Sequence, residues 1–180
     1  MFEKFTEKAI NVVSSSQESA KKLGLKKVSP ELLLLALFDE AKGISLKIFK
    51  SYDITREKLV DELKKYVEVS TNQSTSIQPL PFDDEYKEIL KKSLDLANKS
   101  GNPTILYEHL FLSAISDKKS NNIKILEDLG FDIYKSKSLL EKLVQKKIKQ
   151  KKQTIYLIAK NQQKYLNVQY LNYQHQTTKS

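Results

Sequence analysis

The residues of this chain best placed to do chemistry are two glutamates, Glu31 and Glu108. Each lies just before an apolar run, and they are 77 residues apart. A carboxylate in the first turn of a helix interacts favourably with the helix dipole, by about 0.3–1 kcal/mol, without any ligand. From the residues alone, both acids are explained by this structural role.

Arrangements typical of catalysis or metal binding are missing from the sequence. His109 precedes an apolar run, His175 lies near the C-terminus, and the chain contains no cysteine. A phosphate-binding loop needs closely spaced glycines before a Lys-Ser/Thr pair, and the four glycines here are far apart. Adjacent acids have the spacing of helix caps and solvated faces, namely Asp83-Asp84 and Glu127-Asp128. We therefore predict no enzymatic activity, no catalytic residue, no metal ion and no cofactor.

The segment around Glu31 predicts the end of one helix, a turn and the start of a buried helix. Gly24 suits the left-handed position that follows a helix C-terminus. Ser29 is a good N-cap, and Pro30 suits the first helical position, where its missing N–H is no loss. The run from residue 32 to residue 38 is apolar on every side. This is the pattern of a helix enclosed by its neighbours.

The same pattern returns 77 residues later, which indicates an internal duplication. Residues 5–67 align with residues 82–144 without a gap and give 15 identities in 63 pairs. Gly24 pairs with Gly101 in this alignment. Self-similarity at a fixed period is the sequence signature of a repeat architecture.

Apolar residues at helical spacing predict four helices in each copy. The first copy has helical segments at 3–23, 30–40 and 44–49 and a fourth stripe from Leu59 to Val67. The second copy has them at 84–100, 106–116, 121–129 and 133–147. We therefore predict an all-α fold with two pseudo-symmetric four-helix repeats, eight helices in all, and a basic C-terminal tail. The expected boundaries are 1–68 for repeat 1, 69–81 for a polar linker, 82–147 for repeat 2 and 148–180 for a flexible tail rich in Tyr, Asn and Gln.

Basic charge is concentrated in that tail. The formal net charge of the chain is +9, yet residues 1–145 carry only +1, because eight lysines and no acid follow residue 145. The tail either extends the last helix and then frays or is disordered beyond about Asn161. Lysines with interleaved tyrosines suit a nucleic acid or an acidic protein surface. A charge run is more often a solvated segment, so nucleic acid is the weakest of the partners considered.

No segment of the sequence is expected to enter a membrane. The longest apolar run has seven residues, whereas a membrane-spanning helix needs about 20. The N-terminal residues lack the apolar core of a secretory signal, and Glu3 and Glu7 argue against a transit peptide. We expect a soluble intracellular protein without membrane association.

The motifs above resemble the Clp N-terminal domain, most closely that of the ClpC branch of AAA+ unfoldases. The resemblance rests on the opening Phe2-Glu3-Lys4-Phe5-Thr6-Glu7-Lys8-Ala9, on the Gly24 turn with Ser29-Pro30-Glu31-Leu32-Leu33-Leu34, and on Tyr107-Glu108-His109-Leu110 in the second copy. It covers roughly residues 2–145 and implies two pseudo-symmetric four-helix repeats. Because the chain has no phosphate-binding loop, it looks like a stand-alone N-domain without AAA+ modules.

In some bacterial ClpC proteins this domain recognises phosphorylated arginine. The resemblance carries that ligand site over to Thr6, Glu31 and Glu108, and to Asp83, where the family pattern has threonine. An additional carboxylate attracts a guanidinium but repels a phosphate. We therefore expect unequal sites, with a Thr6–Glu31 pair preferring phosphoarginine and an Asp83–Glu108 pair tolerating unmodified arginine.

The resemblance implies a substrate- or adaptor-binding module of an ATP-dependent Clp chaperone-protease system. Its partners would be a Clp AAA+ unfoldase or Clp protease subunits, together with adaptor or substrate proteins, and alone it would be a monomer. It would act in a bacterial cytoplasm, or in the plastid stroma if encoded by the organelle. Two alternatives stay open. One is a structural accessory subunit that docks on a Clp ring, and the other is a nucleic-acid binder with a basic tail.

Overall fold

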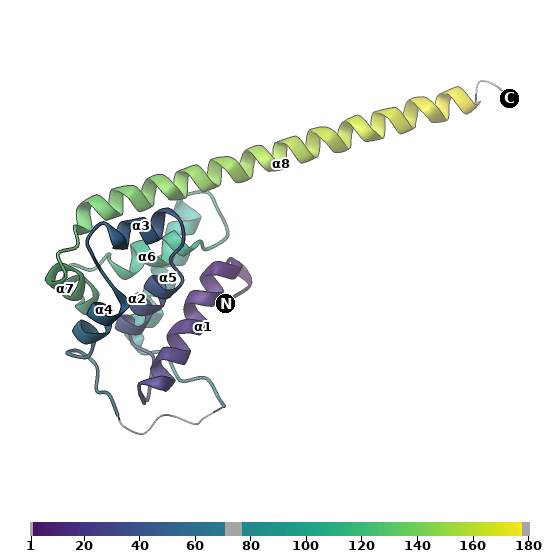
Figure 1. Cartoon of the computed structure of the whole chain (residues 1–180). Coiled ribbons are helices and arrows are strands. Elements are labelled where there is room, and N and C mark those ends of the chain that lie inside the picture. The colour runs from purple at the N-terminus through teal and green to yellow at the C-terminus, as the bar shows by residue number, and fades with distance from the viewer. Residues whose placement is uncertain (1, 71–76, 178–180) are drawn as a thin grey trace. The chain divides into compact units, whose positions relative to one another are not determined.

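The computed structural model describes residues 2–70 and 77–177, and in this part of the chain the fold is all-α (Figure 1). Within the predicted linker at 69–81, residues 71–76 lie outside the described residues. Contacts divide the chain into one compact unit through Val144 and a second from Gln145 onward. The helices are η1 (Phe2–Lys4), α1 (Glu7–Lys22), α2 (Pro30–Asp39), α3 (Ile44–Lys50), α4 (Arg56–Leu63), α5 (Asp84–Lys99), α6 (Tyr107–Ala114), α7 (Asn121–Asp128) and α8 (Ile133–Thr177).

Most helices begin at a polar side chain that accepts a hydrogen bond from the first turn. Thr6 caps α1 by accepting from the Ala9 N–H, and Asp83 caps α5 by accepting from the Tyr86 N–H. Ser29 occupies the N-cap position of α2, as expected, but its side chain makes no capping hydrogen bond. The backbone turns after α1 and α5 also match, because Gly24 and Gly101 have φ values of 67° and 70°. Left-handed backbone of this kind favours glycine at both positions.

The two repeats exchange short backbone pairings at equivalent places. Phe5 forms an isolated parallel bridge with Ile105, and Val28 forms one with Phe82. The first bridge is flanked by a 3.0 Å hydrogen bond from the Thr6 N–H to the Ile105 carbonyl oxygen, and the second by a 3.0 Å bond from the Asp83 N–H to the Val28 carbonyl oxygen. Each repeat therefore places the start of its first helix beside the buried helix of the other repeat.

The core lies along α2 and its counterpart α6. Helix α2 contacts α1, α4, α5, α6 and α7, and every residue from Pro30 to Leu37 is buried. An aromatic cluster joins the repeats, in which the Phe49 and Phe111 rings stack 5.1 Å apart and Phe131 packs against both. The apolar run that predicted an enclosed helix is thus explained by neighbours on every side.

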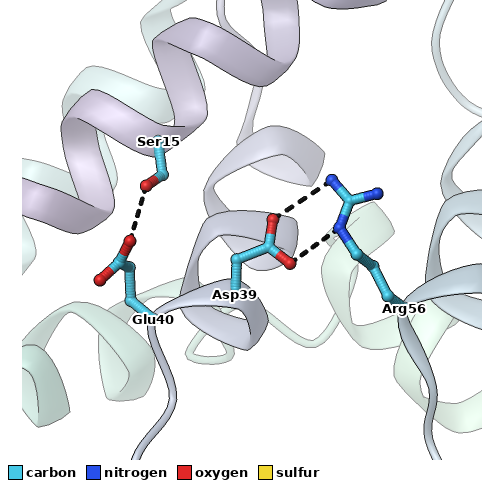
Figure 2. Close-up of polar contacts among 4 residues, drawn as sticks. All are labelled: Ser15, Asp39, Glu40 and Arg56. Carbon is cyan, nitrogen blue, oxygen red and sulfur yellow. Dashed lines mark hydrogen bonds and ion pairs between the residues drawn. The ribbon is translucent and has the colours of Figure 1, made fainter.

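The C-terminal end of α2 is fixed by polar contacts to α1 and to the start of α4 (Figure 2). The Ser15 hydroxyl donates to a carboxylate oxygen of Glu40 at 2.8 Å. The Arg56 guanidinium donates twice to the Asp39 carboxylate, at 2.9 and 3.3 Å. A two-point Arg–carboxylate contact fixes orientation more strictly than a single ion pair. Both contacts fix the C-terminal end of α2, while the packing of its buried residues holds the rest of the helix, including Glu31 at its N-terminal end.

Two helices end at places other than those expected. Helix α4 ends at Leu63, so Tyr66 and Val67 lie outside it. Helix α8, expected to end near residue 147, continues to Thr177. Its extension has a plain cause, because no glycine or proline occurs after Gly130, and these residues are the usual helix breakers.

The first prediction is that the unit through Val144 folds without most of the long helix. All described side chains from residue 149 to residue 175 are exposed, whereas Ile148 is buried. A chain shortened to residues 1–150 should therefore unfold cooperatively, with a midpoint close to that of the full chain, in a thermal melt followed by circular dichroism. Loss of the cooperative transition would contradict this and would show that the distal part of α8 belongs to the core.

Candidate ligand-binding groove

Glu31 is a buried acid at the N-terminal end of α2. Its exposed fraction is 4%, and its carboxylate accepts a 2.8 Å hydrogen bond from the side-chain amide of Asn121 on α7. A buried carboxylate needs such a partner because leaving water costs it several hydrogen bonds. The contact crosses the boundary between the repeats, so the second repeat fixes the acid of the first.

A groove of about 1000 Å³ opens beside Glu31. It is bounded by the turn after α1, the residues that follow α4, and the starts of α2, α5 and α7. Its apolar wall includes Leu25, Val67 and Val69, while Tyr66 adds an aromatic ring. Its charged residues have both signs, with an excess of acids, and are Lys26, Lys27, Glu31, Glu68, Asp83 and Glu85.

Asp83 lies in this groove with Glu31. Burial raises the pKa of the Asp83 carboxyl above its usual value, opposed by the hydrogen bond from the Tyr86 N–H and by the charge of Lys27. The negative charge of Glu31 raises the same pKa further. Two neighbouring carboxylates in a partly buried site favour a cation between them. The groove therefore holds two carboxylates that repel each other, with Lys27 near enough to offset part of that repulsion.

Thr6 lies at the equivalent place in the other half of the fold, near the start of α6. Its hydroxyl donates to the Ile105 carbonyl oxygen at 3.2 Å and accepts from the Ala9 N–H at 3.3 Å. Glu108, three residues after Ile105, has an exposed fraction of 2%. The Lys8 ammonium lies 4.1 Å from the centre of the Tyr107 ring, a cation–π distance. This half therefore combines a buried acid with a lysine that contacts the ring of the preceding residue, Tyr107.

The pairing predicted from the sequence is thus wrong, although the four residues do gather in two places. We expected Thr6 with Glu31 and Asp83 with Glu108, each pair within one repeat. The structure places Asp83 beside Glu31, and Thr6 beside the start of the helix that carries Glu108. The cause is the exchange of the two short bridges between repeats, which an alignment of the copies cannot reveal.

Asn121 is the residue of the site that sequence reasoning missed. At the 77-residue offset its counterpart in the first repeat is Ile44, so a polar amide replaces an apolar residue. A polar residue at a position that is apolar in the other copy was a usable signal. By contrast, His109 has a structural role, in keeping with the prediction of no catalytic residue. Its Nδ1 accepts from the Leu106 N–H at 3.1 Å, so its ring caps α6 where leucine cannot.

The described residues contain neither a cluster that could bind a metal ion nor a helix that could span a membrane. Within residues 2–70 and 77–177, no cluster of three or more His, Cys, Asp or Glu side chains is arranged to hold a metal ion. No helix in these ranges has the length and apolar content needed to cross a membrane.

The second prediction tests the contact between Asn121 and Glu31. Replacing Asn121 with alanine removes a hydrogen bond to a buried carboxylate, so the free energy of unfolding should fall by about 1–3 kcal/mol. Urea unfolding of the purified chain measures this change. Glu127→Ala, on the same helix and exposed, is the control and should change stability by less than about 0.5 kcal/mol. Equal stabilities for the two variants would contradict a buried Asn121–Glu31 bond.

Comparison with known proteins identifies the family of this fold. The family model described as the Clp repeat N-terminal domain matches the sequence of this chain twice, at residues 4–82 and 81–167. An ATP-dependent Clp protease ATP-binding subunit ClpA homolog of Guillardia theta is 33% identical over 144 residues, covering 80% of this chain and 17% of that protein. The chloroplastic chaperone protein ClpC2 of Arabidopsis thaliana is 36% identical over 132 residues, covering 73% of this chain and 14% of that protein. The chain thus spans about a sixth of the length of these relatives.

Solved structures show the same fold. The N-terminal domain of the caseinolytic protease-associated chaperone ClpD from Arabidopsis thaliana superposes with a TM-score of 0.65 at 22% identity, covering 83% of this chain and 97% of that one. The N-terminal domain of Hsp104 from Candida albicans superposes with a TM-score of 0.62 at 16% identity, covering 77% and 90%. Two four-helix repeats are therefore the shared architecture.

Proposed function

The chain belongs to the Clp repeat N-terminal domain family, and from this membership we propose that it binds substrate or adaptor proteins for an ATP-dependent Clp chaperone-protease system. The family domain is a binding module rather than a catalytic one. Relatives in chloroplasts make the plastid stroma a suitable compartment, and a bacterial cytoplasm is the other. The mechanism is docking, in which a rigid two-repeat platform holds a segment of a client and presents it to an AAA+ ring.

The groove beside Glu31 is the observation that carries this proposal. It combines apolar wall residues with a paired set of acids, Glu31 and Asp83, on elements fixed by the fold. Apolar walls with a few placed polar groups are typical of ligand sites. A peptide segment lying here would bury its apolar side chains on Val67 and Val69 and direct a cationic side chain to the carboxylates.

The charges of the groove favour unmodified arginine over phosphoarginine. Glu31, Glu68, Asp83 and Glu85 place four carboxylates in the groove, against two lysines, Lys26 and Lys27. A carboxylate binds a guanidinium in a two-point contact that lysine cannot reproduce, whereas it repels a phosphate. In the other half of the fold the Thr6 hydroxyl contacts Ile105 and the Lys8 ammonium contacts the Tyr107 ring. This hydroxyl and ammonium lie at the start of the helix that carries Glu108, and we propose this half as the better place for a phosphorylated arginine. We therefore keep the expectation of unequal sites, with the partners exchanged.

A co-purification experiment tests the proposed function. A proteolytically inactive Clp ring and a set of its clients are mixed with the tagged chain, and the retained proteins are identified. We expect both ring and clients to be retained, and we expect the chain to change the ATPase rate of the ring while hydrolysing no ATP itself. Retention of the ring without clients would favour the structural accessory subunit. Retention of neither, or ATP hydrolysis by the pure chain, would contradict the proposal.

A further inference from the structure

The part of α8 that follows Val144 has a composition unlike the rest of the chain. This segment, residues 145–177, is called here the basic half of α8. It contains no acid and seven lysines, which are Lys146, Lys147, Lys149, Lys151, Lys152, Lys160 and Lys164. Five of these lie within two turns of helix, because they fall between residues 146 and 152.

The basic half of α8 is the part of the helix coloured from green to yellow in Figure 1. It also exposes large apolar side chains along its length. Ten such residues are between 49% and 66% exposed, and they are Ile155, Tyr156, Leu157, Ile158, Tyr165, Leu166, Val168, Tyr170, Leu171 and Tyr173. Ten large apolar side chains exposed on one helix are typical of an interaction site rather than of a free surface.

The sequence of this segment contains no helix breaker, but its own side chains supply little packing to stabilise a helix. Like charges lie four residues apart at Lys147–Lys151 and at Lys160–Lys164, and such pairs destabilise a helix. Most helical stability in proteins comes from packing of an apolar face, yet all described side chains from 149 to 175 are exposed. A partner that covers the apolar residues and neutralises the lysines would supply both missing contributions.

The distribution of apolar residues and lysines along this segment distinguishes among the partners that it could bind. Four consecutive apolar residues, 155–158, point in directions about 100° apart and so occupy every side of the helix. A helix lying on an anionic membrane needs one apolar and one polar face, which this segment lacks. A second copy of the chain would bring lysines against lysines with no acid to balance them. A nucleic acid would contact the lysines and stack on the tyrosines, but it would leave the aliphatic residues, Ile155, Leu157 and Ile158 among them, uncovered.

We propose that the basic half of α8 is a docking helix enclosed by an acidic, α-helical protein partner. Carboxylates of the partner face the lysines between residues 146 and 152, and its apolar residues pack around residues 155–158 and then along the helix to Tyr173. A helix that is apolar all round is one that neighbouring helices surround. Because the lysines cluster at the N-terminal end of this segment, the acidic end of the partner must lie there, which fixes the orientation of the partner along the helix.

Titration of the full chain with a fluorescent, four-heptad amphipathic peptide tests this proposal. The peptide carries leucine at the a and d positions and glutamate at e and g, and its scrambled version has the same composition. We expect micromolar binding of the patterned peptide in near-physiological salt and binding at least about tenfold weaker for the scrambled one. Double-stranded DNA and anionic phosphatidylserine vesicles should also bind more weakly than the patterned peptide.

Three variants assign the binding to the proposed residues. Changing the five lysines between 146 and 152 to glutamine should weaken peptide binding by about tenfold or more. Ile155→Gln with Ile158→Gln should do the same, and both variants should keep the melting midpoint of the parent chain. Lys91→Gln with Lys92→Gln, in exposed positions on α5, is the matched control and should leave binding unchanged. The proposal is overturned if the scrambled peptide, DNA or vesicles bind as tightly as the patterned peptide, or if the isoleucine variant binds normally.

Discussion

Replacing Leu33 or Leu110 with alanine should lower the free energy of unfolding by about 2–5 kcal/mol. Both leucines are fully buried, with exposed fractions of 0%, and they occupy equivalent positions on α2 and α6. Each change removes three carbon atoms from a close-packed interior that cannot collapse completely around the gap. Because the two helices are related by the internal duplication, the two losses should be of similar size.

Chemical unfolding of the two variants measures this prediction. Leu139→Ala is the matched control, because Leu139 is 37% exposed, and its loss of stability should be clearly smaller. A change below about 0.5 kcal/mol at either buried leucine, the range of surface substitutions, would mean that the corresponding helix is not enclosed in solution.

Replacing Phe111 with alanine should have the largest effect of any single change considered, a loss of about 3–5 kcal/mol. Phe111 is completely buried and stacks on Phe49 with ring centres 5.1 Å apart. Its ring also lies 6.2 Å from that of Tyr107 and 6.3 Å from that of Phe131. The substitution therefore opens a cavity where aromatic residues of both repeats meet.

A double-mutant cycle isolates the stacking contribution. The Phe49→Ala and Phe111→Ala changes, alone and together, should show a coupling of about 0.5–1.5 kcal/mol beyond additivity. Tyr134→Ala, at a position 86% exposed, should leave stability almost unchanged and serves as the control. Strict additivity of the two phenylalanine changes would contradict direct contact between the repeats at this point.

The fold was predictable because local signals and the duplication agreed. Gly24, Pro30 and the apolar run after Glu31 defined one helix boundary, and the second copy repeated it at a constant offset. The family comparison confirms the two-repeat, all-α architecture. The cap at Asp83 and the structural role of His109 also followed from local chemistry, since both depend on neighbours within three residues.

The arrangement of the site was not predictable from the same signals. Whether Asp83 lies beside Glu31 or beside Glu108 depends on the bridges Phe5–Ile105 and Val28–Phe82, which join residues far apart in the chain. The Asn121–Glu31 hydrogen bond joins residues 90 positions apart and is equally non-local. Helical spacing reports which face a residue occupies, but it does not report which element covers that face.

The measurement that tests the central proposal most directly is a calorimetric titration with an arginine-containing peptide and its phosphoarginine form. The titrated proteins are the wild-type chain, Glu31→Gln and Glu108→Gln. Glutamine at position 31 keeps an acceptor for Asn121. Glutamine also has nearly the same size as glutamate at both positions, so both variants should remain folded. We predict that wild type binds the unmodified peptide and that Glu31→Gln binds it about tenfold or more weakly, as expected for the loss of one charged hydrogen-bond partner. Glu108→Gln should lose affinity mainly for the phosphorylated form. Absence of binding of either peptide at millimolar concentration, or unchanged affinity in Glu31→Gln, would contradict the assignment of the groove.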